Sequence, residues 1–502
     1  MNKIMFWIVV ALIVLLAMAA LAVFIQGLKR GRGSNRVMAQ TIDDTDALLE
    51  SLSYNKGEPL VAYYTGTTKK ALANDPWRED IARWSSPCEE RGLVVGASGK
   101  GKTAFLIAQL VDWMQSGKSF VATDVKPEIW AILKQNDLFN AYGYEDIVIN
   151  PTDPNASKYN PFDDIKSFDE IDELLFVAVP KERENPVFTD NARRLMKAIM
   201  YHLKETTGTV SLPAMRDYRY KVGDMDALLK ILKKSPNQVA SRNAQDILDA
   251  SKNENFFASI LGAFNESLDF LNNQVISDSL ASSDVSLSEV LQQPRKAVFL
   301  QFDEADKAKN YKVFGIMVSH VLRMLQLDHR NRDDVFIAID EIINSAPIAD
   351  LPNRINVMRS AKMPMFMYLQ TIDGLIPLYG EEGKKAIVSG CALKICYAVH
   401  EMADAVAFSE IAGETEVYNT SHSVSPEVSP TGRVYNKTST SSSVTTDSRV
   451  RPEQLLQMEK NHAFVVNQGQ SGKLKMPVFH EDLPMPDRPQ FGNVSEYLEL
   501  YG

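Results

Sequence analysis

One eight-residue stretch of this 502-residue chain leaves few folds open to it. The stretch reads Gly96-Ala97-Ser98-Gly99-Lys100-Gly101-Lys102-Thr103 and fits the pattern G-x-x-x-x-G-K-S/T. It follows a short apolar run, residues 92–95, and opens a helical pattern over residues 103–116 that ends at Gly117. A strand, a glycine-rich turn and a helix in this order predict a loop that holds phosphate groups.

The chemistry of this loop follows from its residue types. Glycines let the backbone curl until several N–H groups point at phosphate oxygens, and the amino terminus of the helix adds a favourable field for an anion. Lys102 is then expected to reach the β- and γ-phosphates, and the Thr103 hydroxyl is expected to bind Mg²⁺. We therefore predict that residues 96–103 bind ATP together with Mg²⁺. A glycine turn that fits the pattern by chance is the alternative.

An acidic pair supplies the partner that such a loop needs on a neighbouring strand. Residues 335–339 form the apolar run Val-Phe-Ile-Ala-Ile, and Asp340 and Glu341 follow it directly. The run predicts a strand buried on both faces, with Asp340 near the Mg²⁺ ion and Glu341 placed to polarise the attacking water. A buried strand that ends in two solvated acids is the alternative. The adjacent carboxylates favour ATP hydrolysis over binding alone.

Two further side chains are candidates for catalysis. Gln370 ends the apolar run 365–369, and if that strand neighbours the Asp340 strand, its amide can sense the γ-phosphate or orient water. Arg359 lies between the two strands in the sequence, where an arginine can stabilise transition-state charge across a subunit interface. A polar strand end and a surface salt bridge are the respective alternatives.

Strand-like and helical patterns alternate from about residue 90, which predicts an α/β fold with a parallel sheet covered by helices. Helical patterns alone fill residues 191–284, so we expect an all-α domain there, inserted into a nucleotide-binding domain of residues 61–190 and 285–490. Residues 420–449 are rich in Ser and Thr and predict a flexible loop or an exposed hairpin. Further strands are expected near residues 120–122, 147–149, 297–300, 393–397 and 463–466.

The amino-terminal end predicts a membrane anchor. Residues 4–25 are an unbroken apolar run, long enough as a helix to cross the roughly 30 Å hydrocarbon core of a bilayer. Four basic residues follow the run between positions 29 and 36, and this excess of positive charge places the rest of the chain in the cytoplasm. We therefore expect an anchor at residues 1–26, a cytoplasmic linker at residues 27–60 and a single-pass protein of the plasma membrane. A cleaved signal peptide is the alternative, but its basic residues would precede the apolar run.

Composition narrows the range of partners. The chain has 54 Lys and Arg against 64 Asp and Glu, a net charge of −10, which excludes a wholly basic protein that coats DNA but not a local basic channel. Its three cysteines are too few for a disulfide scaffold and match no zinc pattern, as expected in a reducing cytosol. The tightest basic group is Arg193, Arg194 and Lys197, which either contacts DNA phosphates or forms a solvated helix face.

The order of these motifs resembles the coupling-protein family of type IV secretion systems, the TraG/TraD-type conjugation ATPases. Residues 123–128, Thr-Asp-Val-Lys-Pro-Glu, resemble the family's Asp-x-Lys-Gly-Glu segment, with Pro127 in place of its usual glycine. Asn150-Pro151 and the segment Tyr-Asn-Pro-Phe-Asp at residues 159–163 also resemble family segments. The resemblance covers roughly residues 90–484, and its other matching segments are residues 188–192, 340–341, 359–360, 369–370 and 451–456.

This resemblance implies a RecA-like ATPase domain with an inserted all-α domain, assembled as a ring hexamer at the inner membrane. It implies that the protein receives a relaxase–DNA complex, with single- or double-stranded DNA, and passes it to the proteins of the secretion channel by hydrolysing ATP. Many relatives have two membrane-spanning helices, whereas this sequence has one candidate. The residues that take the roles given above are Lys102, Thr103, Asp340, Glu341, Gln370 and Arg359.

Three other functions remain open on the sequence. A DNA translocase of the FtsK type would need several membrane spans and a carboxy-terminal winged-helix module, for which residues 484–502 are too short. A membrane-anchored, protein-directed ATPase of the AAA type would hydrolyse ATP without regard to DNA. An adaptor that binds ATP without hydrolysing it would not need both Asp340 and Glu341.

Overall fold

The computed structural model describes residues 45–52, 55, 57–64, 82–180, 186–301, 307–328, 332–344, 347–361, 363–428 and 434–479. These residues divide into two compact units. Residues 413–449 form the described part of one unit, and the other described residues form the second, larger unit.

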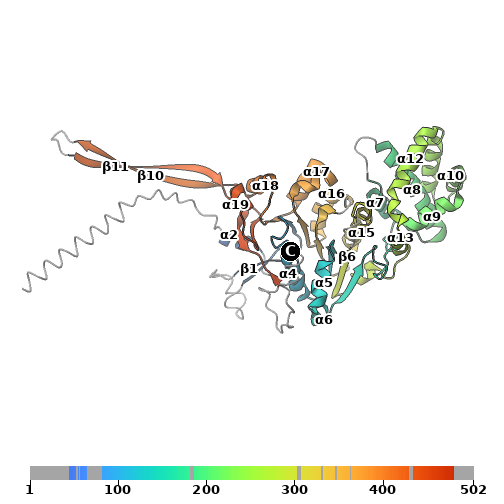
Figure 1. The fold of residues 1–502 in the computed structure, drawn as a ribbon, viewed down its shortest axis with the longest axis horizontal. Coiled ribbons are helices and arrows are strands. Elements are labelled where there is room, and N and C mark those ends of the chain that lie inside the picture. Colours follow the sequence, from blue (N-terminus) through green and yellow to red (C-terminus); the bar gives the residue numbers. More distant parts are fainter. Residues whose placement is uncertain are drawn as a thin grey trace, which may run out of the picture. The chain divides into compact units, whose positions relative to one another are not determined.

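A nine-stranded sheet forms the centre of the larger unit (Figure 1). The seven strands from β9 to β5 run parallel, and β12 and β13 extend the sheet by antiparallel pairing. This arrangement confirms the predicted α/β fold with a large parallel sheet. In spatial order the strands are β13 (Gln470–Lys475), β12 (His462–Asn467), β9 (Leu393–Cys396), β3 (Arg91–Val95), β8 (Met365–Leu369), β7 (Phe336–Ile339), β4 (Phe120–Asp124), β6 (Lys296–Gln301) and β5 (Glu145–Ile149).

The central strands are apolar and buried along their whole length. Every residue of β3, β7 and β8 is buried, which is the pattern of parallel strands covered on both faces. Trp113 of helix α4 (Lys102–Met114) packs on Phe336 of β7, with 5.4 Å between the ring centroids. The other helices of the sheet-containing region are α5 (Glu128–Gln135), α6 (Leu138–Tyr142), α15 (Lys307–Asp328), α16 (Leu351–Ser360), α17 (Ile376–Gly390), α18 (Met402–Ala412) and α19 (Pro452–Leu456).

Three of the described strands, β1 (Leu60–Tyr64), β2 (Ala82–Ser85) and β13, were not predicted from the sequence. β13 carries glycine and lysines at the edge of the sheet, where only one neighbour strand pairs with it, so its sequence lacks the apolar run of a central strand. The other two, β1 and β2, form a separate antiparallel pair. Their ladder depends on residues about twenty positions apart, which no local pattern reveals.

The end of the predicted linker is part of the folded unit. Thr45–Ser51 forms helix α2, and its residues Leu48 and Leu49 are buried in the main hydrophobic core. Asn467 Nδ2 of β12 donates a hydrogen bond to the Ser51 carbonyl oxygen at 2.9 Å. The assignment of residues 45–52 to a linker is therefore wrong, because their leucine side chains pack in the core beside β12 and β13.

The predicted membrane anchor, residues 1–26, and the first part of the predicted linker lie outside the described residues. In the part of the chain that the structure does describe, no helix has both the length and the apolar character needed to cross a membrane.

Helices alone connect β5 to β6 in the described part of the chain. The longest begins at Pro186, five positions before the start of the predicted all-α domain, so this helix crosses the predicted boundary. Ser211, Asp224, Asn237 and Asn253 each accept a backbone N–H at the start of the following helix, which explains where these helices begin. The helices are α7 (Phe168–Ala178), α8 (Pro186–Thr207), α9 (Leu212–Val222), α10 (Met225–Lys233), α11 (Gln238–Ala250), α12 (Glu254–Ser267), α13 (Gln274–Ser279) and α14 (Leu287–Val290), with the short 3-10 helix η1 (Asp269–Asn272).

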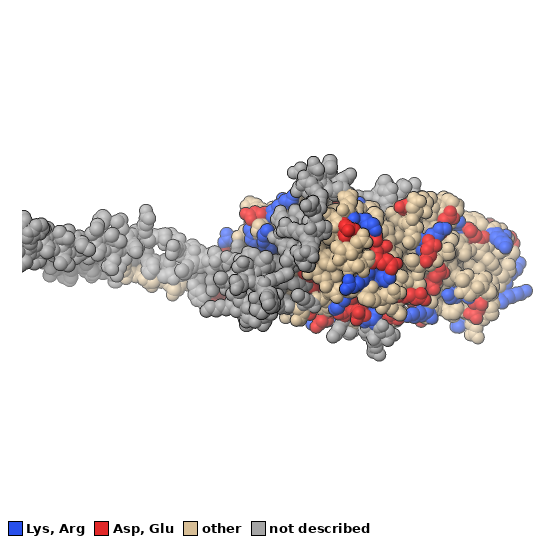
Figure 2. Space-filling model, turned by 90° about the horizontal axis from the view of Figure 1, so that it is seen from below, with Lys and Arg blue, Asp and Glu red and all other residues tan. Residues whose placement is uncertain are grey.

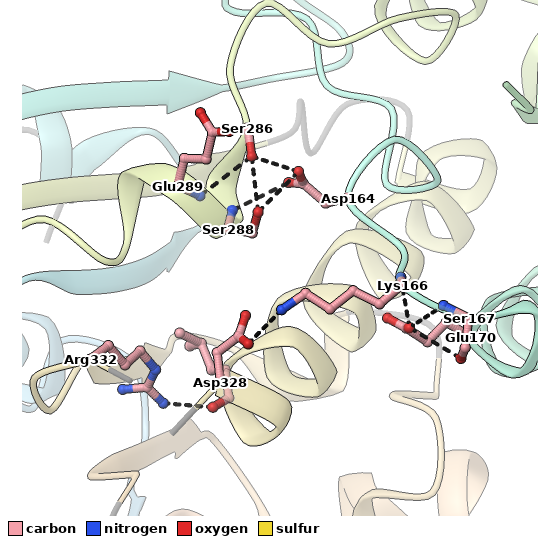
Figure 3. Close-up of polar contacts among 10 residues, drawn as sticks. Asp164, Lys166, Ser167, Glu170, Ser286, Ser288, Glu289, Asp328 and Arg332 are labelled. Atoms are coloured by element: carbon pink, nitrogen blue, oxygen red, sulfur yellow. Dashed lines mark hydrogen bonds and ion pairs between the residues drawn. The ribbon is translucent and has the colours of Figure 1, made fainter. Parts of the chain in front are cut away.

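Polar contacts hold together the two chain segments that lead into and out of this helical region (Figure 3). Asp164, which follows β5, accepts hydrogen bonds from Ser286 Oγ at 2.6 Å and from Leu287 N at 2.9 Å, at the start of α14. Lys166 pairs with Asp328 at the end of α15. The segment 159–163 that resembles a family motif lies in the same connection, where Asn160 Nδ2 donates to the Val210 carbonyl oxygen at 2.9 Å and Tyr159 N donates to that of Ser279 at 3.0 Å.

The smaller unit is an antiparallel hairpin of β10 (Glu414–Val428) and β11 (Val434–Ser448). Its residues pair without interruption from Glu414 opposite Ser448 to Val428 opposite Val434. In the described residues 420–428 and 434–448 the structure therefore has the hairpin that the sequence left open, and not a loop. Thr and Val favour extended backbone, and the ladder satisfies the backbone polar groups, so a polar segment can still form regular strands.

Candidate nucleotide-binding site

The predicted phosphate loop joins β3 to α4 and is fixed to the chain on both sides. Gly96 N donates to the carbonyl oxygen of Leu369 in β8 at 3.2 Å, and Ala97 N donates to that of Ala398, just beyond β9, at 2.8 Å. Ser98 and Gly99 are exposed at the tip of the loop, whereas Lys102 is buried. The loop is thus held in place by its neighbours, with its tip open to solvent.

Glycine is required at two positions of the loop. A Cβ atom on Gly96 would lie 2.5 Å from the Cβ of Tyr397, too close for any side chain. Gly101 has a φ of 112°, and a Cβ there would lie 2.4 Å from Oδ1 of Asn461. Since Gly101 is the residue before α4, the missing side chain lets Asn461 pack against the amino terminus of that helix.

Lys102 points into the loop that precedes it. Its Nζ donates hydrogen bonds to the carbonyl oxygens of Gly96 at 2.5 Å and of Ala97 at 3.0 Å. Burial lowers the pKa of Lys102, while the charges of Asp340 and Glu341 oppose that shift. The ammonium group therefore lies where the phosphates of a nucleotide would be bound, with both acids close enough to act on it. Thr103 follows as the second residue of α4.

The two acids follow β7, but β7 does not neighbour the strand before the phosphate loop. Strand β8 lies between β3 and β7, so the expectation of adjacent strands is wrong. Sequence patterns indicate strands but not their order across a sheet. The intervening strand ends in Gln370, whose Nε2 donates a hydrogen bond to Oε1 of Glu341 at 3.3 Å. Gln370 therefore stands between the phosphate loop and the acidic pair.

Asp340 is held by its backbone and crowded by negative charge. Its N–H donates to Thr123 Oγ1 at 2.7 Å, and the same hydroxyl donates to the Asp340 carbonyl oxygen at 3.1 Å. Burial raises the pKa of Asp340 to about 7, and the nearby charges of Glu341 and Asp124 raise it further while Lys102 opposes them. A carboxylate in this setting is stabilised by a divalent cation, so the residues present fit Mg²⁺.

Protein ligands alone are too few to hold that ion. The described residues contain no group of three or more His, Cys, Asp and Glu side chains placed to bind a metal. With Asp340 and the Thr103 hydroxyl as the candidate protein ligands, a Mg²⁺ ion here would take its other oxygens from the nucleotide and from water, as Mg²⁺ usually does.

Arg359 is the one candidate that the fold separates from the others. It lies in the last turn of α16, with its side chain exposed. Burial raises the pKa of Glu90 and lowers that of Arg91, and the charge of Arg359 lowers both, which places it near the start of β3. The phosphate loop follows the other end of that five-residue strand, roughly 16 Å away at about 3.3 Å per residue. Arg359 therefore lies near the amino-terminal ends of the parallel strands, whereas the phosphate loop of its own chain lies at their carboxyl ends.

Sequence reasoning gave no role to the segment Thr123–Glu128, which the structure places beside the acids. β4 pairs with β7, so the chain beyond β4 runs next to Asp340 and Glu341. Lys126 Nζ lies 4.0 Å from Oε1 of Glu341. The segment also lines an open pocket of about 570 Å³, whose other wall is residues 150–154. The sequence signal that could have identified this segment is Asp124, Lys126 and Glu128, three charged residues at and just after the end of a strand.

Asp124, in the same segment, has a structural role. Its carboxylate accepts hydrogen bonds from Ile129 N at 3.1 Å, from Trp130 N at 3.0 Å and from Gln301 Nε2 at 2.8 Å. Two of these donors are orphan N–H groups in the first turn of α5, so Asp124 caps that helix across the loop.

We therefore expect Asp124→Ala to lower the free energy of unfolding by about 2–4 kcal/mol, because two buried donors and one partly buried donor would lose their acceptor. Denaturant unfolding of the full-length protein measures this loss. Asp153→Ala is the matched control, since Asp153 is exposed and bonds only within its own turn among the contacts described, to Asn155. Equal stability of the two variants would contradict the capping role.

The basic group proposed for DNA contacts is engaged with acids. Arg193 pairs with Asp190, Arg194 lies 3.8 Å from Asp246, and Lys197 pairs with Asp172. Over the described residues of the face drawn in Figure 2, acidic and basic side chains are likewise interspersed. These pairs favour the solvated helix face over a phosphate-binding group at residues 193–197.

Comparisons with known proteins give one family and one recurring fold. A family model described as type IV secretory system conjugative DNA transfer matches residues 44–490. No curated protein sequence matches the chain. Three solved structures of the bacterial conjugative coupling protein TrwB are similar, each at 16% sequence identity over 80% of this chain and 87% of that chain. The TM-score is 0.63 for an unbound form, 0.61 for the complex with ADP and Mg²⁺, and 0.61 for the complex with the ATP analogue ADPNP.

Proposed function

This chain belongs to the type IV secretory system conjugative DNA transfer family, and from that membership we propose that it is a membrane-anchored ATPase that drives DNA transfer. One observation carries the proposal. The phosphate loop with Lys102, the acids Asp340 and Glu341, and Gln370 all meet at the carboxyl edge of three adjacent parallel strands. Ligands bind at this edge in open α/β sheets.

The nucleotide is ATP, bound at residues 96–103. The loop backbone and the amino terminus of α4 are placed to bind phosphate oxygens, and Lys102 reaches the β- and γ-phosphates. The TrwB complexes with ADP and Mg²⁺ and with ADPNP support this assignment, because a protein of the same fold forms complexes with those nucleotides. Thr103 and Asp340 would hold Mg²⁺ together with the phosphates, and the ion would supply positive charge against the charge that develops on the transferred phosphoryl group.

Hydrolysis is assigned to Glu341 and Gln370. A water oxygen attacks the γ-phosphorus, the bond from that phosphorus to the bridging oxygen of ADP breaks, and the water proton passes to the Glu341 carboxylate. Gln370 donates to Oε1 of Glu341, so its amide orients the carboxylate and lies beside the position of the water. Products are ADP and inorganic phosphate, and the proton on Glu341 returns to solvent.

The nucleotide-binding domain is of the RecA-like type, and it works in a ring, with six subunits as the proposed number. The position of Arg359 supports an assembly, because this arginine and its own phosphate loop lie at opposite ends of the parallel strands. In a ring, the surface of one subunit that carries Arg359 can face the nucleotide bound by the next subunit. Arg359 would then stabilise transition-state charge in the neighbouring subunit.

The proposed cargo is DNA carrying a relaxase, delivered to the proteins of a type IV secretion channel. Family membership supports this cargo, because the family is defined by conjugative DNA transfer. The apolar run at residues 4–25, followed by basic residues, supports a single span in the plasma membrane with the bulk of the chain in the cytoplasm. DNA that leaves the cell crosses the plasma membrane, so we expect the ATPase that drives its transfer at that membrane.

ATP turnover by the full-length protein in detergent, measured with and without single- and double-stranded DNA, tests the proposal. We expect turnover that rises with DNA and disappears in Lys102→Ala, together with loss of DNA transfer in cells that carry this variant. Turnover that is indifferent to DNA would instead favour a protein-directed ATPase. Bound ATP without any turnover would favour a non-hydrolysing adaptor.

A further inference from the structure

The side chains of Glu341, Gln370 and Lys126 meet at one point of the site, and the role of Lys126 is not explained by the mechanism. Oε1 of Glu341 accepts the Gln370 amide at 3.3 Å and lies 4.0 Å from Nζ of Lys126. Lys126 also lies close enough to Lys102 for its charge to lower the pKa of that lysine, after burial as the main cause. The site therefore has two cations beside its two acids, not the single lysine of the phosphate loop.

Lys126 is exposed to solvent, whereas the acid that it faces is mostly buried. Its side chain is 44% exposed and borders the 570 Å³ pocket, whereas the Glu341 side chain is only 15% exposed. A distance of 4.0 Å is the outer limit of an ion pair, so the contact does not lock the lysine. Its backbone, in contrast, is anchored by buried Val125 and by the contacts of Asp124 with α5.

A bound γ-phosphate changes which partner attracts this lysine most. A terminal phosphate carries about two negative charges and Glu341 carries one, so at equal distance the phosphate attracts Lys126 about twice as strongly. ADP lacks the γ-phosphate and presents no such competitor. Whether Lys126 contacts Glu341 or the ligand therefore depends on the phosphate that distinguishes ATP from ADP.

We propose that Lys126 is a second phosphate-binding cation of this site, paired with Glu341 until ATP binds and then with the γ-phosphate. The inference rests on the proposed ATPase function. Transfer of Lys126 to the phosphate removes the lysine from Oε1 of Glu341, where Gln370 still donates and the attacking water can approach. The carboxylate thus keeps its contact with Lys126 when no γ-phosphate is bound and loses that contact when the substrate is complete.

Binding affinities for the analogue ADPNP and for ADP, each with Mg²⁺, test this assignment on the full-length protein in detergent. In Lys126→Ala we expect the affinity for ADPNP to fall about 10- to 30-fold and that for ADP to stay within about twofold, because only ADPNP has the γ-phosphate. Lys126→Arg keeps the charge and is expected to retain most of the preference for ADPNP. Neither ADPNP nor ADP is hydrolysed in this measurement, so the measured affinities do not depend on turnover.

Lys134→Ala is the matched control. Lys134 lies in the neighbouring helix α5, its side chain is 52% exposed, and it pairs with Asp146 at 3.0 Å. This variant removes the same charge and should leave both affinities unchanged. Equal losses for ADPNP and ADP in Lys126→Ala, or no loss for either, would overturn the inference while leaving the ATPase proposal intact. A wild-type protein that binds neither nucleotide would overturn both.

Discussion

Glu341→Gln is expected to reduce the rate of ATP hydrolysis by about 10²- to 10⁴-fold while ATP remains bound, because the amide cannot accept the proton of the attacking water. The substitution keeps the size of the side chain and its ability to accept the hydrogen bond from Gln370. It leaves Lys102 and residues 96–103 untouched, so the phosphate groups keep their protein partners. Single-turnover hydrolysis and ATP binding, measured on the same preparation, separate the two effects.

Glu128→Gln is the control for this experiment. Glu128 opens α5, and its charge is among those that raise the pKa of Asp340, so its loss also makes the site less negative. If a general base is what Glu341 supplies, Glu128→Gln should retain most of the turnover. Comparable losses in the two variants would point to the total charge around Asp340 as the important quantity. Full turnover in Glu341→Gln would require another base.

The second large effect concerns Arg359 and requires two subunits. Arg359→Ala and Lys102→Ala are each expected to be inactive alone, and a mixture of the two is expected to regain turnover. The reason is geometric, because Arg359 lies near the start of β3 and the phosphate loop follows its end. In a random one-to-one mixture, about a quarter of the interfaces would combine an intact phosphate loop with an intact arginine from the neighbour.

A mixture of Lys102→Ala with Glu341→Gln serves as the control. These two residues act on the same nucleotide from the same subunit, since the charge of Glu341 acts on Lys102 within one chain. No interface in that mixture contains both intact residues, so it should stay inactive. Turnover in the control mixture, or none in the first mixture, would count against a shared site.

Much of the site was visible in the sequence because its signals are local. The strand predicted at residues 365–369 is β8 without a shift, and the loop at residues 96–103 joins a strand to a helix as predicted. Each signal depends on apolar runs and turn residues within about ten neighbouring positions. The same local reasoning indicated the helical content between residues 191 and 284.

Local reasoning failed where pairing or packing between distant segments decides the structure. Among the described residues, 420–428 pair with 434–442 in an unbroken ladder, a hairpin that composition alone does not distinguish from a flexible loop. Residues 45–52 read as linker, yet Leu48 and Leu49 are buried in a core that includes strands more than four hundred positions later in the chain. In the second case the stabilising contacts come from partners that no pattern within the segment reveals.

By itself, the amino-acid sequence predicted which residues would form the phosphate loop and which acids would follow a buried strand, and it determined the family to which the chain belongs. Tertiary structure alone decided that β8 separates β3 from β7, that Arg359 lies apart from its own site, and that Lys126 reaches Glu341. The physical reason is the separation along the chain over which each kind of interaction acts. Turn chemistry and hydrophobic periodicity act between neighbours, whereas the order of parallel strands is set by contacts such as that of Thr123 with Asp340, 217 positions apart.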